Sequence, residues 1–290
     1  MPADNTTDNT VDRTVFPLRL AGIAHRVFPA GRSRIDDPFS LRHFTDLTAL
    51  YGVERRPDAA ERGTGNTFAT MARALLDDLP PEAHRADIAV VAHATPDLDC
   101  RLAAVTSLAA VIEGGPQVFT VTDCGSAAPF AALRVAGEYV RRHGYRRAVV
   151  FALDQSTLPY ETGRPLAGDA GVALLLTDTG TRGGLTVRRT PGVSVAGMAA
   201  AVRAELAVLG ADPSLPVVLG PAVEPARDLP RYGGRIVRAA PGGPASGVLA
   251  ALAMDRWWQA GRAGAAGLVI VDHEPDTGDL SVCLVERNPS

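Results

Sequence analysis

Two periodicities of hydrophobic and polar positions alternate along the chain. Short apolar runs rich in β-branched residues, typical of buried strands, alternate with longer stretches whose apolar residues recur every three or four positions, as in helices. The predicted strands span residues 17–24, 87–94, 117–122, 147–153, 171–177, 184–189, 215–219, 234–238, 267–272 and 280–286. The predicted helices span residues 38–51, 66–79, 98–112, 126–142, 194–210 and 245–261. This alternation predicts an α/β fold with buried, largely parallel strands.

The order of these elements repeats along the chain. In each half the last two strands, 147–153 with 171–177 and 267–272 with 280–286, are joined by a polar loop instead of a helix. The sequence therefore predicts two copies of one unit: an N-terminal half over residues 15–180 and a C-terminal half over residues 181–290. The polar residues 1–14 are predicted to form a disordered tail.

Composition and charge exclude several classes of protein. Of the 290 residues, 46% are hydrophobic and 21% are charged, as in an ordinary globular protein. The net charge of −3 argues against a nucleic-acid partner. No signal peptide and no apolar run of about 18 residues is present, so we expect a cytoplasmic protein without a membrane segment. Three cysteines do not make a disulfide framework, which fits a reducing compartment.

Cys124 stands where a predicted strand runs directly into a predicted helix of small residues. The segment reads VFTVTDCGSAAPF over residues 118–130. The N–H groups and the positive dipole end of a helix stabilise a thiolate, lower the pKa of a cysteine and stabilise an oxyanion. This context favours a nucleophile. The alternative is a buried, inert cysteine, which is how we interpret Cys100 and Cys283.

The segment around Cys124 resembles the active-site elbow of the thiolase-like superfamily, specifically of ketoacyl synthase III and its relatives in specialised metabolism. Three other segments resemble family motifs in the same order: YGVERR at 51–56, DIAVVAHATPD at 87–97 and GDAGVAL at 168–174. The resemblance covers about residues 17–287. It implies a thiolase-like fold of two pseudo-repeated βαβαββ-type halves with buried central helices, and it implies a dimer.

The sequence departs from this family at two positions of the second half. The family's catalytic His and Asn align with Gly220 and Gly242. Neither glycine has a side chain that could move a proton or donate a hydrogen bond. We therefore expect no decarboxylative condensation.

Two histidines are candidate bases for Cys124. His93 ends a predicted strand, near the position of a catalytic acid in the related hydroxymethylglutaryl-CoA synthases. His273 lies in the loop that matches the family's last active-site loop, with Glu274 or Asp272 as a possible orienting partner. The alternatives are a structural role for His93 and a solvated surface turn for His273.

The substrate is expected to arrive as a thioester, on the phosphopantetheine of an acyl carrier protein or on coenzyme A. The Trp and Arg that stack the adenine of coenzyme A in the family are absent before Gly52, which favours a carrier protein. Carrier proteins are acidic, so arginines near the tunnel mouth are candidate substrate-binding residues. They are Arg32, Arg34, Arg55 and Arg56. No zinc-ligand spacing and no phosphate loop is present, and we expect no metal and no other cofactor.

Together these features predict an atypical ketosynthase III-like acyltransferase that forms a Cys124-linked acyl-enzyme. Two alternatives stay open. One is a non-catalytic partner subunit, comparable to a chain-length factor, in a heterodimer with a complete ketosynthase. The other is a thioester hydrolase, in which water is the acceptor. The acyltransferase hypothesis implies a homodimer.

Overall fold

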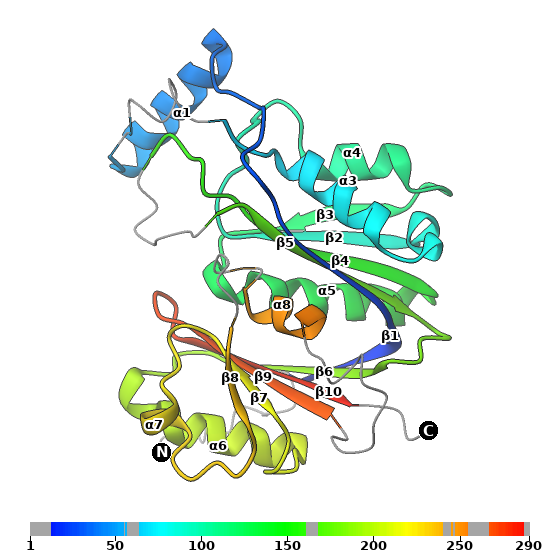
Figure 1. Ribbon diagram of the computed structural model, residues 1–290, viewed down its shortest axis with the longest axis vertical. Helices are drawn as coiled ribbons and strands as arrows, with labels where there is room; N and C mark the ends of the chain where they lie inside the picture. Colours follow the sequence, from blue (N-terminus) through cyan, green and yellow to red (C-terminus); the bar gives the residue numbers. More distant parts are fainter. Residues whose placement is uncertain are drawn as a thin grey trace, which may run out of the picture.

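The computed structural model describes residues 13–54, 56, 64–160, 168–239, 245, 247–254 and 267–286 (Figure 1). The strands are β1 (Arg13–Val27), β2 (Ile88–His93), β3 (Gln117–Val121), β4 (Arg147–Asp154), β5 (Ala170–Thr177), β6 (Gly183–Thr190), β7 (Val217–Leu219), β8 (Ile236–Arg238), β9 (Gly267–Glu274) and β10 (Asp279–Glu286). The α-helices are α1 (Pro38–Tyr51), α3 (Phe68–Asp78), α4 (Ala104–Val111), α5 (Ala128–His143), α6 (Met198–Leu209), α7 (Pro225–Asp228) and α8 (Gly247–Met254).

The described strands form one sheet in the order β3-β2-β4-β5-β1-β6-β10-β9-β7-β8. Each strand from β1 to β5 has a counterpart five strands later, from β6 to β10. If every strand is replaced by its counterpart, the result is the same order read from the opposite edge of the sheet. The two halves of the chain are therefore related by a pseudo-two-fold axis between β1 and β6. This confirms the predicted α/β fold and its two-fold repetition.

The sheet is mixed, so the expectation of largely parallel strands is wrong. Strands connected through helices pair in parallel, namely β2 with β3 and β4, and β7 with β8 and β9. The strands that end each half, β4 with β5 and β9 with β10, pair antiparallel because a loop joins them. The pairs of β1 and β6 at the centre are antiparallel too.

Helices α5 and α8 lie between the two halves. Helices α3 and α4 lie on the outer side of the first half and α6 on that of the second, while α1 lies apart from the sheet (Figure 1). The central core combines residues of both halves, among them Leu20, Phe130, Leu249 and Ile270. A second cluster packs α3 and α4 on the outer face of the first half, and a third packs α6 on the outer face of the second. The inner face of the sheet thus adjoins the central helices, and the outer faces adjoin α3, α4 and α6.

Several elements differ from the sequence prediction, and two boundaries and one added helix show why. Strand β1 begins at Arg13, so residues 13 and 14 belong to the sheet and not to a tail. Helix α4 begins at Ala104 instead of residue 98. Before it, Asp97 and Asp99 accept backbone N–H groups two residues ahead, at 3.3 and 3.0 Å, which favours turns over helix. Helix α7, a single turn, was not expected. None of the described helices has the length and hydrophobicity to cross a lipid bilayer.

Candidate active site

Cys124 lies in the elbow that the sequence predicts. Strand β3 ends at Val121, and a short 3-10 helix over Gly125–Ala127 leads directly into α5. Asp123 takes a φ of 62°. A residue other than glycine in this left-handed region costs about 1 to 3 kcal/mol, and such residues cluster at functional sites. The turn leaves Cys124 partly exposed, with its thiol donating to the Thr122 carbonyl at 3.4 Å.

Two backbone N–H groups at the start of this helix already have partners. The N–H of Ala127 donates to the Cys124 carbonyl at 3.0 Å. The N–H of Ser126 donates to Oε2 of Glu274, the last residue of β9, at 2.6 Å. Gly125, whose φ is 52°, leaves the room for this carboxylate, because a Cβ at that position would overlap it. Sequence analysis named Glu274 only as a possible partner of His273 and missed this contact.

The expectation of a lowered pKa at Cys124 is wrong. Burial raises the pKa of the thiol, and the charge of Asp279 raises it further. Arg189 acts in the opposite direction, while Asp123 and Glu274 add to the increase. Arg189 forms an ion pair with Asp279 at 2.8 Å. Negative charges therefore predominate around the elbow, and the raised pKa keeps Cys124 a protonated thiol at neutral pH.

His93 lies beside the elbow at the end of β2. Its Nδ1 is 3.3 Å from the hydroxyl oxygen of Thr122, the residue whose carbonyl accepts the Cys124 thiol. Its ring packs on Phe68, with 4.7 Å between the ring centroids. Burial lowers the pKa of His93, so its ring is neutral at pH 7 and able to accept a proton. His93 and Cys124 thus meet through Thr122.

Asp97 is an ionisable group that sequence analysis did not single out for a role. It follows β2, and its carboxylate accepts the Phe68 N–H that begins α3, at 3.0 and 3.2 Å. Burial raises its pKa to about 6. Its place in the Thr95-Pro96-Asp97 turn was visible in the sequence, but its burial was not.

His273 does not face Cys124, which corrects the sequence expectation. Strand β9 continues through Glu274, so His273 belongs to the strand and not to a surface turn. Neighbouring residues of a strand point to opposite faces. Glu274 reaches the elbow on the inner face, and His273 is buried on the outer face, where its Nε2 lies 2.9 Å from the Val193 carbonyl oxygen. Val193 belongs to the cluster around α6.

Gly220, which follows β7, has no space for the family's histidine. A Cβ at this position would overlap the carboxylate of Asp272, a buried residue of β9. The backbone N–H of Gly220 donates to the Val271 carbonyl at 2.8 Å, which holds the two strands together. Gly242, the position aligned with the family's asparagine, lies outside the described residues.

The predicted substrate-binding arginines are only partly described. Arg55 lies outside the described residues. Arg32, Arg34 and Arg56 are exposed, and the backbone N–H of Arg56 donates to the Pro159 carbonyl at 2.8 Å. Their position fits a surface role, and contact with a substrate stays a prediction.

The Gly168-Asp169 motif has a structural role. Asp169 accepts hydrogen bonds from the backbone and side-chain amides of Asn66 at 3.0 and 2.9 Å. Its other oxygen accepts the Ser156 N–H at 2.7 Å. The motif thereby ties the loop before α3 to the loop after β4, next to the end of β2 that carries His93.

The contact between Glu274 and the elbow has a counterpart across the pseudo-two-fold axis. Asp154 ends β4 as Glu274 ends β9, and its Oδ1 accepts the Ala245 N–H, just before α8, at 3.0 Å. Each half therefore ends its fourth strand on a carboxylate that binds the start of the other half's central helix. The sequence repeat predicted the strands but not this exchange.

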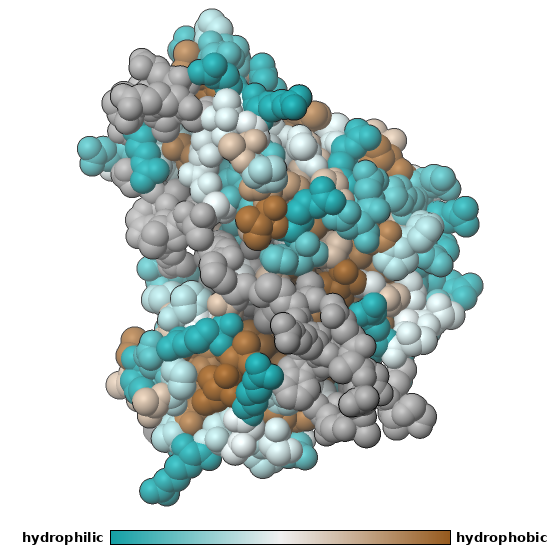
Figure 2. All heavy atoms as spheres, in the orientation of Figure 1, coloured by the Kyte–Doolittle hydropathy of each residue, from teal (hydrophilic) through white to brown (hydrophobic). Residues whose placement is uncertain are grey.

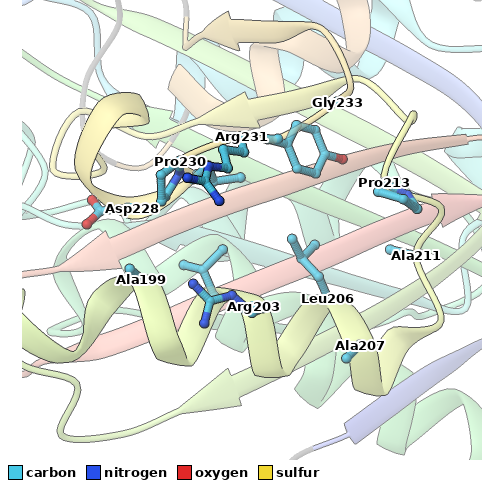
Figure 3. Close-up of a pocket in the computed structure, with 13 residues that line it drawn as sticks. Ala199, Arg203, Leu206, Ala207, Ala211, Pro213, Asp228, Pro230, Arg231 and Gly233 are labelled. Atoms are coloured by element: carbon cyan, nitrogen blue, oxygen red, sulfur yellow. The ribbon is translucent and has the colours of Figure 1, made fainter.

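A cavity of about 320 Å³ opens elsewhere, between α6 and residues 229–233 (Figure 3). Arg203 and Leu206 rise from α6 toward Pro230 and Arg231 on the opposite wall. Hydrophobic surface gathers between β8 and α6, with hydrophilic side chains beside it (Figure 2). Because α6 covers the outer face of the sheet, this cavity is separate from the elbow on the inner face.

No protein-family model and no curated protein matches the sequence. Solved structures match it over nearly the full length. The 3-oxoacyl-(acyl carrier protein) synthase III of Pseudomonas aeruginosa PAO1 is 18% identical, over 96% of this chain and 99% of that chain, with a TM-score of 0.60. AbyA1, a tetronic acid condensing enzyme, is 20% identical, over 94% and 99%, with a TM-score of 0.61.

OleA of Xanthomonas campestris is 13% identical, over 99% of both chains, with a TM-score of 0.56. At these identities the likeness shows the fold. The chain therefore has the thiolase-like fold of ketosynthase III-type enzymes, as its sequence motifs predict.

Proposed function

We propose that this protein is an atypical ketosynthase III-like acyltransferase of specialised metabolism, working through an acyl-enzyme on Cys124. The proposal rests above all on the partly exposed Cys124 at a strand-to-helix elbow with a left-handed residue before it. The likeness to condensing enzymes supports the use of thioester substrates. An acyl carrier protein is the proposed donor, with acyl-CoA as the alternative.

The reaction has two steps. Cys124 loses its proton and its sulfur attacks the carbonyl carbon of the acyl thioester, whereupon the donor leaves as a thiol carrying a proton. An amine, alcohol or thiol then attacks the acyl carbon, gives up its proton and releases the Cys124 sulfur, which is protonated again. His93 is the proposed base for these proton transfers, since its neutral ring contacts Thr122 beside the thiol.

Simple acyl transfer fits the site better than carbon–carbon bond formation. Decarboxylation of a malonyl group needs donors that stabilise an enolate. At Gly220 the carboxylate of Asp272 takes the space of such a donor, and a carboxylate does not stabilise negative charge. We therefore propose that the acceptor is a heteroatom nucleophile. Water as acceptor would make the protein a thioester hydrolase.

A second candidate function is a non-catalytic partner subunit in a heterodimer with a complete ketosynthase. Two observations favour it: the raised pKa of Cys124, and the Ser126 N–H that Glu274 already occupies. The partly exposed thiol and the strained Asp123 favour the enzyme.

The test is the intact mass of the protein after incubation with acyl-CoA and acyl-carrier thioesters. We expect an increase by the mass of one acyl group, at least about tenfold slower or absent in Cys124→Ala. Cys100→Ala, which changes another partly exposed cysteine, is the matched control and should acylate normally. No adduct with any donor would contradict the transferase and would favour the partner subunit, which co-purification with a complete ketosynthase would then test.

A further inference from the structure

The side chain of Glu274 is fitted into the elbow that carries Cys124. Its Oε2 accepts the Ser126 N–H at 2.6 Å, and its Oε1 accepts the Asp276 N–H at 3.1 Å. The residue is only 1% exposed. Gly125 provides the space, since any side chain there would overlap the carboxylate. Glu274 is thus held on both oxygens, next to the backbone of the proposed nucleophile.

A carboxylate in this place opposes the usual effect of a helix start on a cysteine. The first turn of a helix stabilises a nearby anion through its N–H groups and its dipole. Here Glu274 is that anion, and a thiolate at Cys124 would be a second negative charge beside it. The Cys124 sulfur lies 3.4 Å from the Thr122 carbonyl oxygen, a partner for the protonated thiol and not for a thiolate.

We propose that Glu274 is a positioning residue that sets the reactivity of Cys124: by binding the Ser126 N–H it keeps the thiol protonated and slow to react. The inference rests on the proposed role of Cys124 as the nucleophile.

Other charged side chains also act on the pKa of Cys124, so a useful variant must change Glu274 without disturbing them. Asp123 lies on the elbow, Asp279 on β10 and Arg189 on β6. Asp279 and Arg189 pair with each other at 2.8 Å, so the loss of either would leave the other without that partner. Glu274→Gln removes one negative charge and keeps an oxygen that accepts the Ser126 N–H.

The pseudo-two-fold axis supplies a matched control. Asp154 binds the start of α8 as Glu274 binds the start of the short helix before α5, at 3.0 Å from the Ala245 nitrogen. Asp154→Asn therefore makes the same kind of change at a helix start that carries no cysteine. A purely structural role would give both variants the same effect on stability and no effect on the thiol.

The experiment is the rate of alkylation of Cys124 by iodoacetamide as a function of pH, followed on the peptide that contains Cys124. In Glu274→Gln we expect the apparent pKa of Cys124 to lose part of its elevation, because burial and Asp279 are the larger causes and remain. The rate at neutral pH should then rise about twofold or more, because the larger thiolate fraction outweighs the lower nucleophilicity of each thiolate. Asp154→Asn should keep the profile of the natural protein.

An unchanged or slower rate in Glu274→Gln, or the same acceleration in Asp154→Asn, would overturn the proposal. If circular dichroism shows that Glu274→Gln is unfolded, Glu274→Asp decides, because its shorter side chain draws the carboxylate back from the Ser126 N–H. Faster alkylation of Cys124 in this variant than in the natural protein would support the proposal, and an unchanged rate would contradict it. Alkylation needs no acyl donor, so this outcome and that of the acylation test are independent.

Discussion

Asp97 shows how the fold changes the protonation of a single carboxyl group. It follows β2, and burial raises its pKa to about 6. The backbone N–H groups that it accepts stabilise its charged form but do not outweigh the burial. Asp99, two residues along, differs: burial raises its pKa, but the hydrogen bonds from Arg101 outweigh this and lower it. Two neighbouring aspartates thus have opposite linkage to pH.

Asp97→Asn should therefore change how stability depends on pH. Since the folded state holds the proton of Asp97 more tightly than the unfolded state, its contribution is present below about pH 4 and is lost as the pH rises through about 6. The free energy of unfolding of Asp97→Asn minus that of the natural protein measures this contribution. We expect the difference to be about 1 to 2 kcal/mol more favourable to the variant at pH 8 than at pH 4. Urea unfolding at both values measures this. For Asp99→Asn this difference should change in the opposite direction between pH 4 and pH 8. If the stabilities of both variants and of the natural protein depend on pH in the same way, the prediction is wrong.

At the scale of elements, the contact between β7 and β9 decides which residue fits at position 220. The two strands pair in parallel, and the Asp272 carboxylate fills the space beside Gly220. Any side chain at position 220 would therefore require the Asp272 carboxylate to move. A histidine introduced at 220 alone would not fit beside it.

Gly220→Ala should lower the free energy of unfolding by about 1 to 3 kcal/mol, because the added methyl group collides with Asp272 in a packed interior. Gly184→Ala, in β6, is the matched control, since a Cβ there meets no atom within 4 Å. Chemical denaturation of Gly220→Ala, Asp272→Ala and the double variant gives the coupling free energy between positions 220 and 272. A coupling below about 0.5 kcal/mol would contradict the collision.

The sequence predicted the elements well and their contacts poorly. Apolar periodicity located every described strand, and the small residues after Cys124 located the elbow, because these are local patterns. The contact of Glu274 with Ser126 joins residues 148 positions apart, and no local pattern encodes it. The expected direction of the pKa of Cys124 was wrong for a similar reason, because burial and the charge of Asp279 on a distant strand raise it. His273 was misplaced because the strand extends two residues further than its apolar run.

At the scale of the whole molecule, the two halves share one core. Leu20 and Phe130 of the first half and Leu249 and Ile270 of the second belong to the same buried cluster. The carboxylates of Asp154 and Glu274 cross between the halves in opposite directions. Each half also has an outer cluster of its own, but the inner faces of both halves depend on the shared core.

Cutting the chain between Thr181 and Arg182, in the turn between β5 and β6, should therefore give fragments that do not fold separately. We expect neither fragment to show a cooperative thermal transition, because each would expose the hydrophobic side of its central helix to water. Co-expression of the two fragments should restore the transition. Differential scanning calorimetry checks this, and a cooperative transition of residues 1–181 alone would show that the shared core is dispensable.

The link between Glu274 and Ser126 also has a consequence in time. A ribosome makes the chain from its N-terminus, so Cys124 emerges long before residue 274 exists. Throughout that interval no carboxylate from β9 lies near Cys124. The link can form only once Glu274 has been synthesised. If Glu274 restrains the sulfur as proposed, Cys124 is more reactive while the chain is being made than in the folded protein.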